Sequence, residues 1–254
     1  MTMTFDLAWW GWLIALLGAF LIGFSKSGIA GLGILAVAMF TWIFPARASV
    51  GIILPLLIVG DLVSLAHYRR SAVWSHLLRL IPWAALGLLA GYFALDKLDA
   101  ALMGKLIGAV LLVVTALQFW RMRSATAMED ASQRIARNIF LVALVGITAG
   151  FFTMVANASG PIMIIYLLAL DLPKLEFMGT GAWFYFLFNI VKTPLNVSLG
   201  LITWQTLSFG LLLTPVVILG GLAGYQTLKR INQNLFEDLA LGLTVVAALR
   251  LMLG

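Results

Sequence analysis

The sequence has no cysteine and only two histidines, His67 and His76, among its 254 residues. The lack of cysteine excludes a disulfide framework, a cysteine-ligated zinc site and thiol chemistry. Asp61 is the only acidic residue well inside an apolar segment. We find neither the spacing of metal ligands nor a nucleophile placed beside a base. We therefore expect no enzyme activity, no metal site and no cofactor.

Charged residues are also scarce: they make up 10% of the chain, while 63% of the residues are hydrophobic. A soluble domain of this size has no need of so much apolar surface, so the composition indicates an integral membrane protein. The apolar stretches have helical length and lack the alternation of outer-membrane strands, which predicts an all-α polytopic protein. The net charge of +6 does not indicate nucleic-acid binding, because membrane topology explains the basic residues between apolar segments.

Ten apolar segments of helical or half-helical length are predicted, over residues 7–25, 28–44, 47–68, 75–95, 101–120, 138–155, 160–171, 175–199, 206–228 and 235–253. Their one long polar connection, 121–137, is predicted to be a cytoplasmic loop between a first membrane repeat, 1–120, and a second, 138–254. No soluble domain fits between these segments. The first six residues lack the basic region of a cleaved signal peptide, so we expect the first helix to be retained.

The two repeats are predicted to be copies of each other. The segment from Pro82 to Tyr92 aligns without gaps on the segment from Pro215 to Tyr225, and Gly23-Phe24 matches Gly150-Phe151. Five crossings per repeat is an odd number, so the copies should have opposite orientations in the membrane.

The loop charges give an independent indication of that inversion. Arg69-Arg70 lies between the third and fourth segments of the first repeat, while 197–203, the equivalent loop of the second, has no charge. Lys229-Arg230 lies after the fourth segment of the second repeat, where the first repeat has no excess of basic residues (Asp96, Lys97 and Asp99). The positive-inside rule explains this exchange if the repeats are inverted, with both termini outside.

Each repeat begins with a polar, glycine-rich break in its apolar sequence. The first, 23–33, reads GFSKSGIAGLG, and the second, 150–161, reads GFFTMVANASGP. The free backbone groups of such a break have no partners in lipid, so it must be buried in protein or line a wet cavity. Two breaks at matching places indicate the binding site of a secondary transporter. The sequence leaves open whether the broken segments are full spans or re-entrant hairpins.

The breaks are predicted to bind an anion. Each precedes a new helix whose N-terminus has free N–H groups and a positive dipole end. In the second break, Ser159 or Asn157 is the expected N-cap, with Pro161 at the first helical position. The alternative is that the glycines serve tight helix packing. The predicted contacts are the backbone at Gly28, Gly31, Gly33 and Gly160, and the side chains of Ser25, Ser27, Thr153, Asn157 and Ser159.

Three interior charges complete the predicted site. Lys26 lies inside the first break, where it either balances the charge of the substrate or belongs to a short cytoplasmic loop. Lys192 either meets the anion or extends outward to the interface. Asp61 is the candidate for proton coupling, or a structural partner for a lysine or arginine. Three polar residues of the equivalent segment either line the same cavity or bond between helices: Asn189, Thr193 and Asn196.

Taken together, the repeats and the motifs GFSKSGIAGLG and GFFTMVANASGP resemble the TauE/SafE sulfite-exporter family of bacterial membrane permeases, over essentially the whole chain. The resemblance implies transport of a small sulfur-containing or organic anion, such as sulfite, a sulfonate or sulfoacetate, across the inner membrane. It also implies that 25–33 and 153–161 flank the substrate path. The lysine in the first break, its fewer consecutive glycines and the aromatic run 183–186 depart from the family pattern, so the particular substrate stays open.

We therefore expect a multi-pass secondary transporter of a small anion, driven by protons or by the membrane potential. Its expected partners are the substrate and the lipid bilayer, with a homodimer as one option for assembly. The alternatives are a passive anion channel on the same scaffold, and a membrane assembly or chaperone subunit that transports nothing. The direction of transport and the coupling ion are left open.

Overall fold

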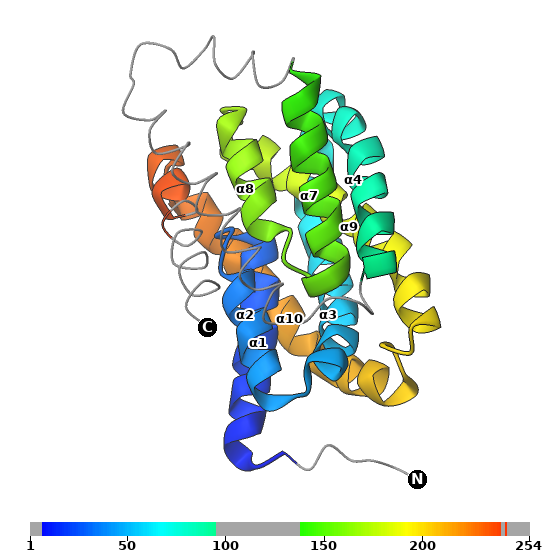
Figure 1. The fold of residues 1–254 in the computed structure, drawn as a ribbon. Coiled ribbons are helices and arrows are strands. Elements are labelled where there is room, and N and C mark those ends of the chain that lie inside the picture. The colour runs from blue at the N-terminus through cyan, green and yellow to red at the C-terminus, as the bar shows by residue number, and fades with distance from the viewer. Residues whose placement is uncertain (1–6, 95–137, 240–241, 243–254) are drawn as a thin grey trace. The chain divides into compact units, whose positions relative to one another are not determined.

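The computed structural model of the chain describes residues 7–94, 138–239 and 242, and this part is helical and free of strands (Figure 1). Eight predicted segments are helices here. The predicted segment 101–120, the connecting loop 121–137 and most of 235–253 lie outside the described residues. The elements are α1 (Trp9–Ser27), α2 (Gly33–Ile43), α3 (Ala46–Tyr68), the short 3-10 helix η1 (Arg69–Ser71), α4 (Trp74–Ala94), α7 (Ile139–Ala156), α8 (Gly160–Ala169), α9 (Lys174–Ser198) and α10 (Trp204–Arg230).

Four helices in the described part are long and apolar enough to cross a membrane: Trp9–Ser27, Ala48–Ser71, Trp74–Ala94 and Trp204–Arg230. Two more are apolar but shorter, Ile139–Val155 and Gly160–Ala169. Helix α9 has 25 residues, but its sequence is interrupted by Asn189, Lys192 and Asn196. These lengths and compositions are those of a membrane protein.

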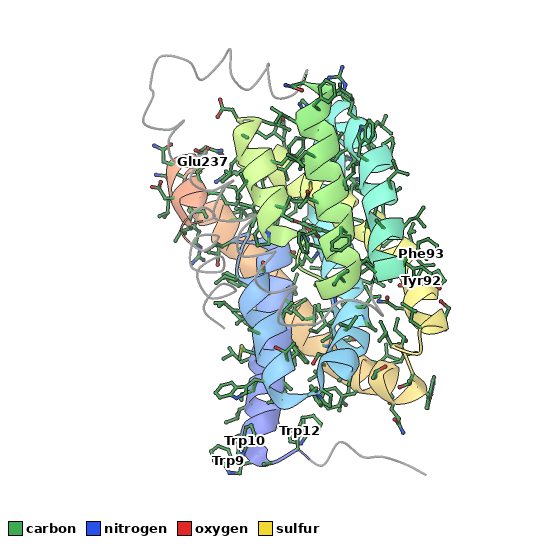
Figure 2. All side chains as sticks on the ribbon, in the orientation of Figure 1. Trp9, Trp10, Trp12, Tyr92, Phe93 and Glu237 are labelled. Atoms are coloured by element: carbon green, nitrogen blue, oxygen red, sulfur yellow. The ribbon has the colours of Figure 1, made fainter. Side chains whose placement is uncertain are left out.

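The exposed side chains of these helices suit a lipid environment. On α4, Leu78, Leu86 and Phe93 are 61%, 54% and 72% exposed, an arrangement that a bilayer accepts and water does not. Trp9 and Trp10 are exposed at the start of α1, where Figure 2 shows them beside Trp12. Tryptophans at helix ends are typical of the membrane–water interface.

The chain forms two compact units, and each takes helices from both halves of the sequence. The first unit is Met1–His67 with Tyr185–Arg230, and the second is Tyr68–Phe184 with Ile231–Gly254. Helix α9 is therefore shared, and its residues from Tyr185 onward belong to the first unit. Each unit is described by itself below.

In the first unit, α1 packs against α2 and α10. The backbones of α1 and α10 touch, because a Cβ atom at Gly23 would lie 1.9 Å from the carbonyl oxygen of Val217 and one at Gly220 would lie 2.1 Å from that of Phe20. Glycine is the residue that permits such close approach of two membrane helices. Around this contact the buried apolar core includes Ala15, Ala19, Ile22, Phe40, Ile52, Phe209 and Leu213.

In the second unit, α4 packs against α7 through the same kind of contact. A Cβ at Gly150 would lie 1.9 Å from the carbonyl oxygen of Ala84, and one at Gly87 would lie 2.0 Å from that of Ile147. Here too the two helices meet backbone to backbone.

The two contacts are equivalent under the alignment of the repeats, in which Gly23 matches Gly150 and Gly87 matches Gly220. Further contacts give the direction of each pair: Gly220 lies against Phe20 and Gly224 against Phe24, while Gly146 lies against Trp83 and Phe151 against Gly91. The residue numbers rise together in both pairs, so each pair runs parallel. The duplicated sequence therefore forms one kind of helix pair twice, once in each unit. Helix packing, which the sequence left as the alternative role of the glycines in the breaks, accounts for Gly23 and Gly150.

Candidate functional site

The first break is shorter than its polar sequence predicts. Helix α1 continues through Lys26 and Ser27, and the irregular link covers only 28–32 before α2 begins. The prediction that Lys26 lies in the break itself is therefore wrong, because Lys26 belongs to the last turn of α1. Gly31 has φ of 106°, a conformation that side-chain-bearing residues rarely adopt, so this link requires a glycine there.

Structural roles account for three of the predicted substrate contacts in this break. The Gly33 N–H donates to the Ser25 hydroxyl oxygen at 2.9 Å, which satisfies one of the free donors at the start of α2. A Cβ at Gly28 would lie 2.6 Å from the Cα of Gly224, so Gly28 permits helix packing. Contact of these residues with a substrate stays a prediction.

Lys26 forms a buried ion pair with Asp61 of α3. The ammonium Nζ lies 2.7 Å from Oδ1 of the carboxylate, with the lysine side chain 13% exposed and the aspartate 0% exposed. Gly60 leaves room for the aliphatic part of Lys26, since a Cβ there would lie 3.1 Å from the lysine Cγ. Lys26 is therefore not a loop lysine. Asp61 has a structural partner, as one of its two predicted roles required, and this partner is Lys26.

Helix α9 completes the surroundings of the ion pair. The Asn189 side-chain amide donates to the second carboxylate oxygen of Asp61 at 2.6 Å. The Tyr185 ring lies under the ammonium of Lys26, with 3.9 Å from Nζ to the ring centroid, a cation–π contact. The sequence left open whether Asn189 lines the cavity or bonds between helices, and this hydrogen bond joins α9 to α3. The sequence missed Tyr185.

Both residues belong to a buried polar stripe along α9. Tyr185, Asn189, Lys192 and Asn196 follow one another at spacings of four, three and four residues, which places them on one helix face. Asn189, Lys192 and Asn196 are 2%, 0% and 0% exposed, whereas Val191 is 54% exposed. Lys192 therefore does not extend outward to the interface. The helical spacing of four polar residues was the sequence signal that identifies the stripe.

This cluster has more basic groups than acidic ones. Lys192 interacts electrostatically with both Lys26 and Asp61, so the first unit places two lysine side chains near one carboxylate. With all three groups in their usual ionic forms, the cluster carries one positive charge. Buried polar groups with no partner in the described part of the chain lie nearby in sequence: the Ser64 hydroxyl and the Asn196 amide. The arrangement is chemically suited to an anion.

The second break lies in the second unit and differs from its prediction. Asn157 ends α7 in the left-handed conformation, with φ of 53°, and is not an N-cap of α8. Ser159 has the N-cap position of α8, but its side chain makes no capping hydrogen bond, and Pro161 is the second rather than the first helical residue. Thr153 and Ser159 are each 3% exposed, and a Cβ at Gly160 would meet nothing within 4 Å. The predicted meeting of the two breaks stays a prediction, since each belongs to its own unit.

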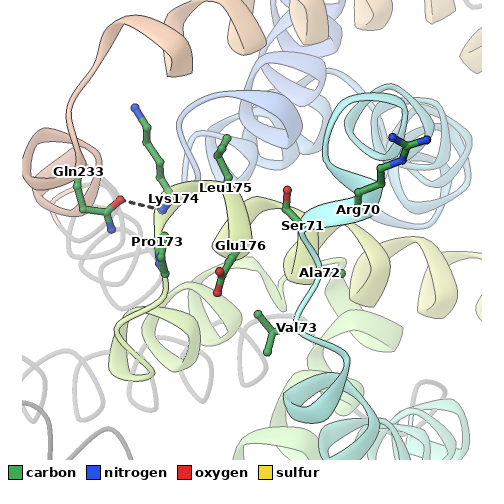
Figure 3. Close-up of a pocket in the computed structure, with 9 residues that line it drawn as sticks. All are labelled: Arg70, Ser71, Ala72, Val73, Pro173, Lys174, Leu175, Glu176 and Gln233. Atoms are coloured by element: carbon green, nitrogen blue, oxygen red, sulfur yellow. Dashed lines mark hydrogen bonds between the residues drawn. The ribbon is translucent and has the colours of Figure 1, made fainter.

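A cavity of about 700 Å³ in the second unit is lined by 70–73, 173–176 and Gln233 (Figure 3). Its polar groups make hydrogen bonds within the protein. The Lys174 N–H donates to Oε1 of Gln233 at 2.8 Å, and Nε2 of Gln233 donates to Glu237 at 2.6 Å. The Lys174 ammonium donates to the carbonyl oxygen of Ile231. None of the predicted substrate contacts lines this cavity.

Comparison with known families gives one match of nearly full length. The model of the family described as "Sulfite exporter TauE/SafE" matches residues 15–251, a range that includes both breaks and the whole ion-pair cluster. Comparison with curated proteins gives no match, and comparison with solved structures gives none.

Proposed function

Since the chain belongs to the sulfite exporter TauE/SafE family of membrane transporters, we propose that it is a secondary transporter of a small sulfur oxyanion or sulfonate. Sulfite, sulfoacetate and related organic anions are the substrate class. The protein crosses the bacterial inner membrane several times, and protons or the membrane potential drive the transport.

The buried charge cluster of the first unit carries this proposal. Lys26 and Lys192 both interact with Asp61, and Lys26 and Asp61 belong to helices of membrane-spanning character. In their usual ionic forms the three groups sum to one positive charge. A charge at the bilayer centre costs about 2.5–3.5 kcal/mol on insertion scales, so an excess charge is unfavourable unless a partner offsets it. A small substrate anion is such a partner, and ammonium and amide N–H groups are the donors that an oxyanion prefers.

The second break supplies the remaining contacts in this proposal. Thr153, Asn157, Ser159 and the backbone at Gly160 face the substrate from the second repeat, and Ser27 with the link 28–32 faces it from the first. The repeats are inverted, and alternating access rocks one against the other around the bound anion. The parallel packing of α1 on α10 and of α4 on α7 supports this arrangement, because inverted five-segment repeats make such pairs parallel.

Proton coupling is assigned to Asp61. It is the only acidic residue between 7 and 94 and is fully buried against two lysines. A carboxylate in that position changes the charge of the cluster by one unit when it binds a proton, which links the charge of the substrate to proton movement.

The test combines ligand binding with exchange across a membrane. Purified protein is screened by thermal shift against sulfite, thiosulfate, sulfate, taurine, sulfoacetate and lactate, because a ligand of the folded state raises the melting temperature. Liposomes that contain the protein and are loaded with the unlabelled anion should then take up the labelled anion by counterflow. We expect Lys192→Met to lower this exchange by about tenfold or more, since one cation of the cluster corresponds to at least about 1.4 kcal/mol.

Lys229→Met is the matched control, because this lysine is exposed at the end of α10, over the ring of Tyr225, and should leave exchange unchanged. Equal exchange by the two variants would contradict the site. Conductance without counterflow would identify a channel instead. Failure to bind or move any anion, together with a partner that co-purifies, would identify an assembly subunit.

A further inference from the structure

The Asp61 carboxylate is held as a bound oxyanion would be. One of its oxygens lies 2.7 Å from the ammonium of Lys26, and the other accepts the amide hydrogen bond of Asn189 at 2.6 Å. The carboxylate is fully buried, and its two ligands come from different helices, α1 and α9. An ammonium and an amide that converge on two oxygens make a recognition site for an oxyanion, and here a side chain of the protein occupies it.

We propose that Lys26 and Asn189 form an oxyanion-binding site, that Asp61 is its internal ligand, and that a substrate oxyanion replaces Asp61 after this carboxylate binds a proton. The inference rests on the proposed function, and it adds how the anion and the proton are linked. One proton bonds to an oxygen of Asp61 and makes it a neutral acid. Oxygens of the substrate then take the contacts with Nζ of Lys26 and Nδ2 of Asn189. For a monoanion, the charge of the cluster is the same before and after.

The competition follows from the distances. A second anion at hydrogen-bond distance from the same ammonium would lie within a few ångströms of the Asp61 carboxylate, and two like charges that close disfavour each other. Titratable groups that interact with Asp61 include Lys26 from α1 and Tyr185 and Lys192 from α9. Neither a lysine ammonium nor the tyrosine side chain can replace the carboxylate as the anionic ligand of Lys26.

The site is prepared for the exchange. The Tyr185 ring supports the ammonium of Lys26 at 3.9 Å through a contact that does not involve Asp61. The Lys26 stem also lies against Gly60. These contacts keep the ammonium in place when the carboxylate releases it, so the substrate meets a donor that is already positioned.

Formate rescue tests the inference without knowledge of the physiological substrate. Asp61→Ala removes the carboxylate and leaves the ammonium and the amide, so formate can take the vacated position. We expect formate to raise the melting temperature of Asp61→Ala by several degrees, at concentrations that leave the wild type and the double variant Lys26→Met/Asp61→Ala unchanged. Formate is ionised throughout the range from about pH 6 to about pH 8, which keeps the probe constant. No response of Asp61→Ala would overturn the inference.

Asp61→Asn gives a second measurement that keeps the side-chain volume and decides the question if Asp61→Ala does not fold. Sulfoacetate is the probe, because its charges do not change over the same pH range. We expect the wild type to bind sulfoacetate more weakly as the pH rises from about 6 to about 8. Asp61→Asn should bind it with no pH dependence, and about tenfold more tightly than the wild type at the higher pH. Equal pH dependence in both proteins would overturn the inference, while counterflow by the wild type would still support the proposed transport function. Absence of both binding and counterflow in the wild type, with formate rescue of Asp61→Ala, would contradict the transport function alone.

Discussion

Asn196 lies on the buried face of α9, one turn beyond Lys192, and is 0% exposed. Neither polar atom of its side chain has a hydrogen-bond partner in the part of the chain that the structure describes. A buried polar group left without a partner costs about 1–3 kcal/mol. Folded proteins keep such a cost mainly where a ligand or a water molecule completes the bonding.

This cost predicts opposite effects of Asn196→Leu on stability and on transport. Leucine has the same branching at Cγ and no unsatisfied polar atom, so the free energy of unfolding should rise by about 1 kcal/mol, less the cost of fitting its larger methyl groups. We expect transport to fall, because we assign this unsatisfied amide, on the same helix face as Lys192, to the substrate path. Thermal unfolding and counterflow measure the two effects in the same preparation.

Thr214→Val is the matched control for that variant. Thr214 of α10 also has a buried hydroxyl without a partner in the described chain. Its replacement should stabilise the protein in the same way and leave counterflow unchanged. Wild-type transport by Asn196→Leu would contradict the assignment of Asn196 to the substrate path.

At the residue scale, the sequence identified the interior charges but not their pairing. Lys26, Asp61 and Lys192 stand out because each interrupts an apolar run. The contact between Lys26 and Asp61 depends on which face α1 turns toward α3. That rotation is determined by backbone contacts of α1 with α10, far along the chain, and hydropathy contains no information about it. Tyr185 was missed because an aromatic residue among aromatic neighbours gives no signal by itself.

At the scale of helices, apolar length predicted the elements well and the breaks poorly. Lys26 lies in the last turn of α1, where it pairs with Asp61, and a hydropathy pattern detects a polar residue without showing its partner. Asn157 was one of two candidates for the N-cap of the second break, and it ends a helix instead. Asparagine is favoured both as an N-cap and in the left-handed conformation at a helix end, so its identity alone does not separate the two.

The helix pair α1–α10 predicts a large effect of Gly23→Ala. The new methyl group would lie 1.9 Å from the carbonyl oxygen of Val217, which belongs to a helix backbone and cannot move aside alone. We expect a loss of about 1–3 kcal/mol or more in the free energy of unfolding. Gly150→Ala, at the equivalent position against Ala84, should cost a similar amount. Thermal unfolding in one detergent compares the variants.

Gly160→Ala provides the control for both, because a Cβ there meets no atom within 4 Å and its backbone needs no positive φ. It should melt like the wild type. If Gly23→Ala also melted like the wild type, α1 and α10 would have to be farther apart than the structure places them.

At the scale of the whole molecule, the sequence repeats and the compact units do not coincide. Helix α1 packs on α10, and α4 packs on α7, so each of these two glycine-mediated pairs joins one helix from each repeat. The ion pair, in contrast, occurs in one repeat, because Thr153 stands where the alignment places Lys26. The two repeats therefore share a type of helix packing, while the Lys26–Asp61 ion pair belongs to the first unit.

This exchange of helices predicts that neither repeat is stable alone. Residues 1–120 contain α1 and α4 without their partners, and 138–254 contain α7 and α10 without theirs. We expect each half, expressed alone, to aggregate in detergent, and the two halves, expressed together, to co-purify through a tag on one of them. Size-exclusion chromatography measures this outcome. A single half that elutes as one species and melts cooperatively would contradict it.

The helix pairs also determine an order of events during biosynthesis. The ribosome makes the chain from its N-terminus, so α1 and its glycine face are in the membrane long before α10 is translated. Asp61 of α3 arrives much earlier and can neutralise Lys26 while that face is still bare. The nascent chain can therefore form the Lys26–Asp61 ion pair early, whereas the contact of α1 with α10 forms late. Until then α1 stays in the bilayer without the helix that covers its glycines.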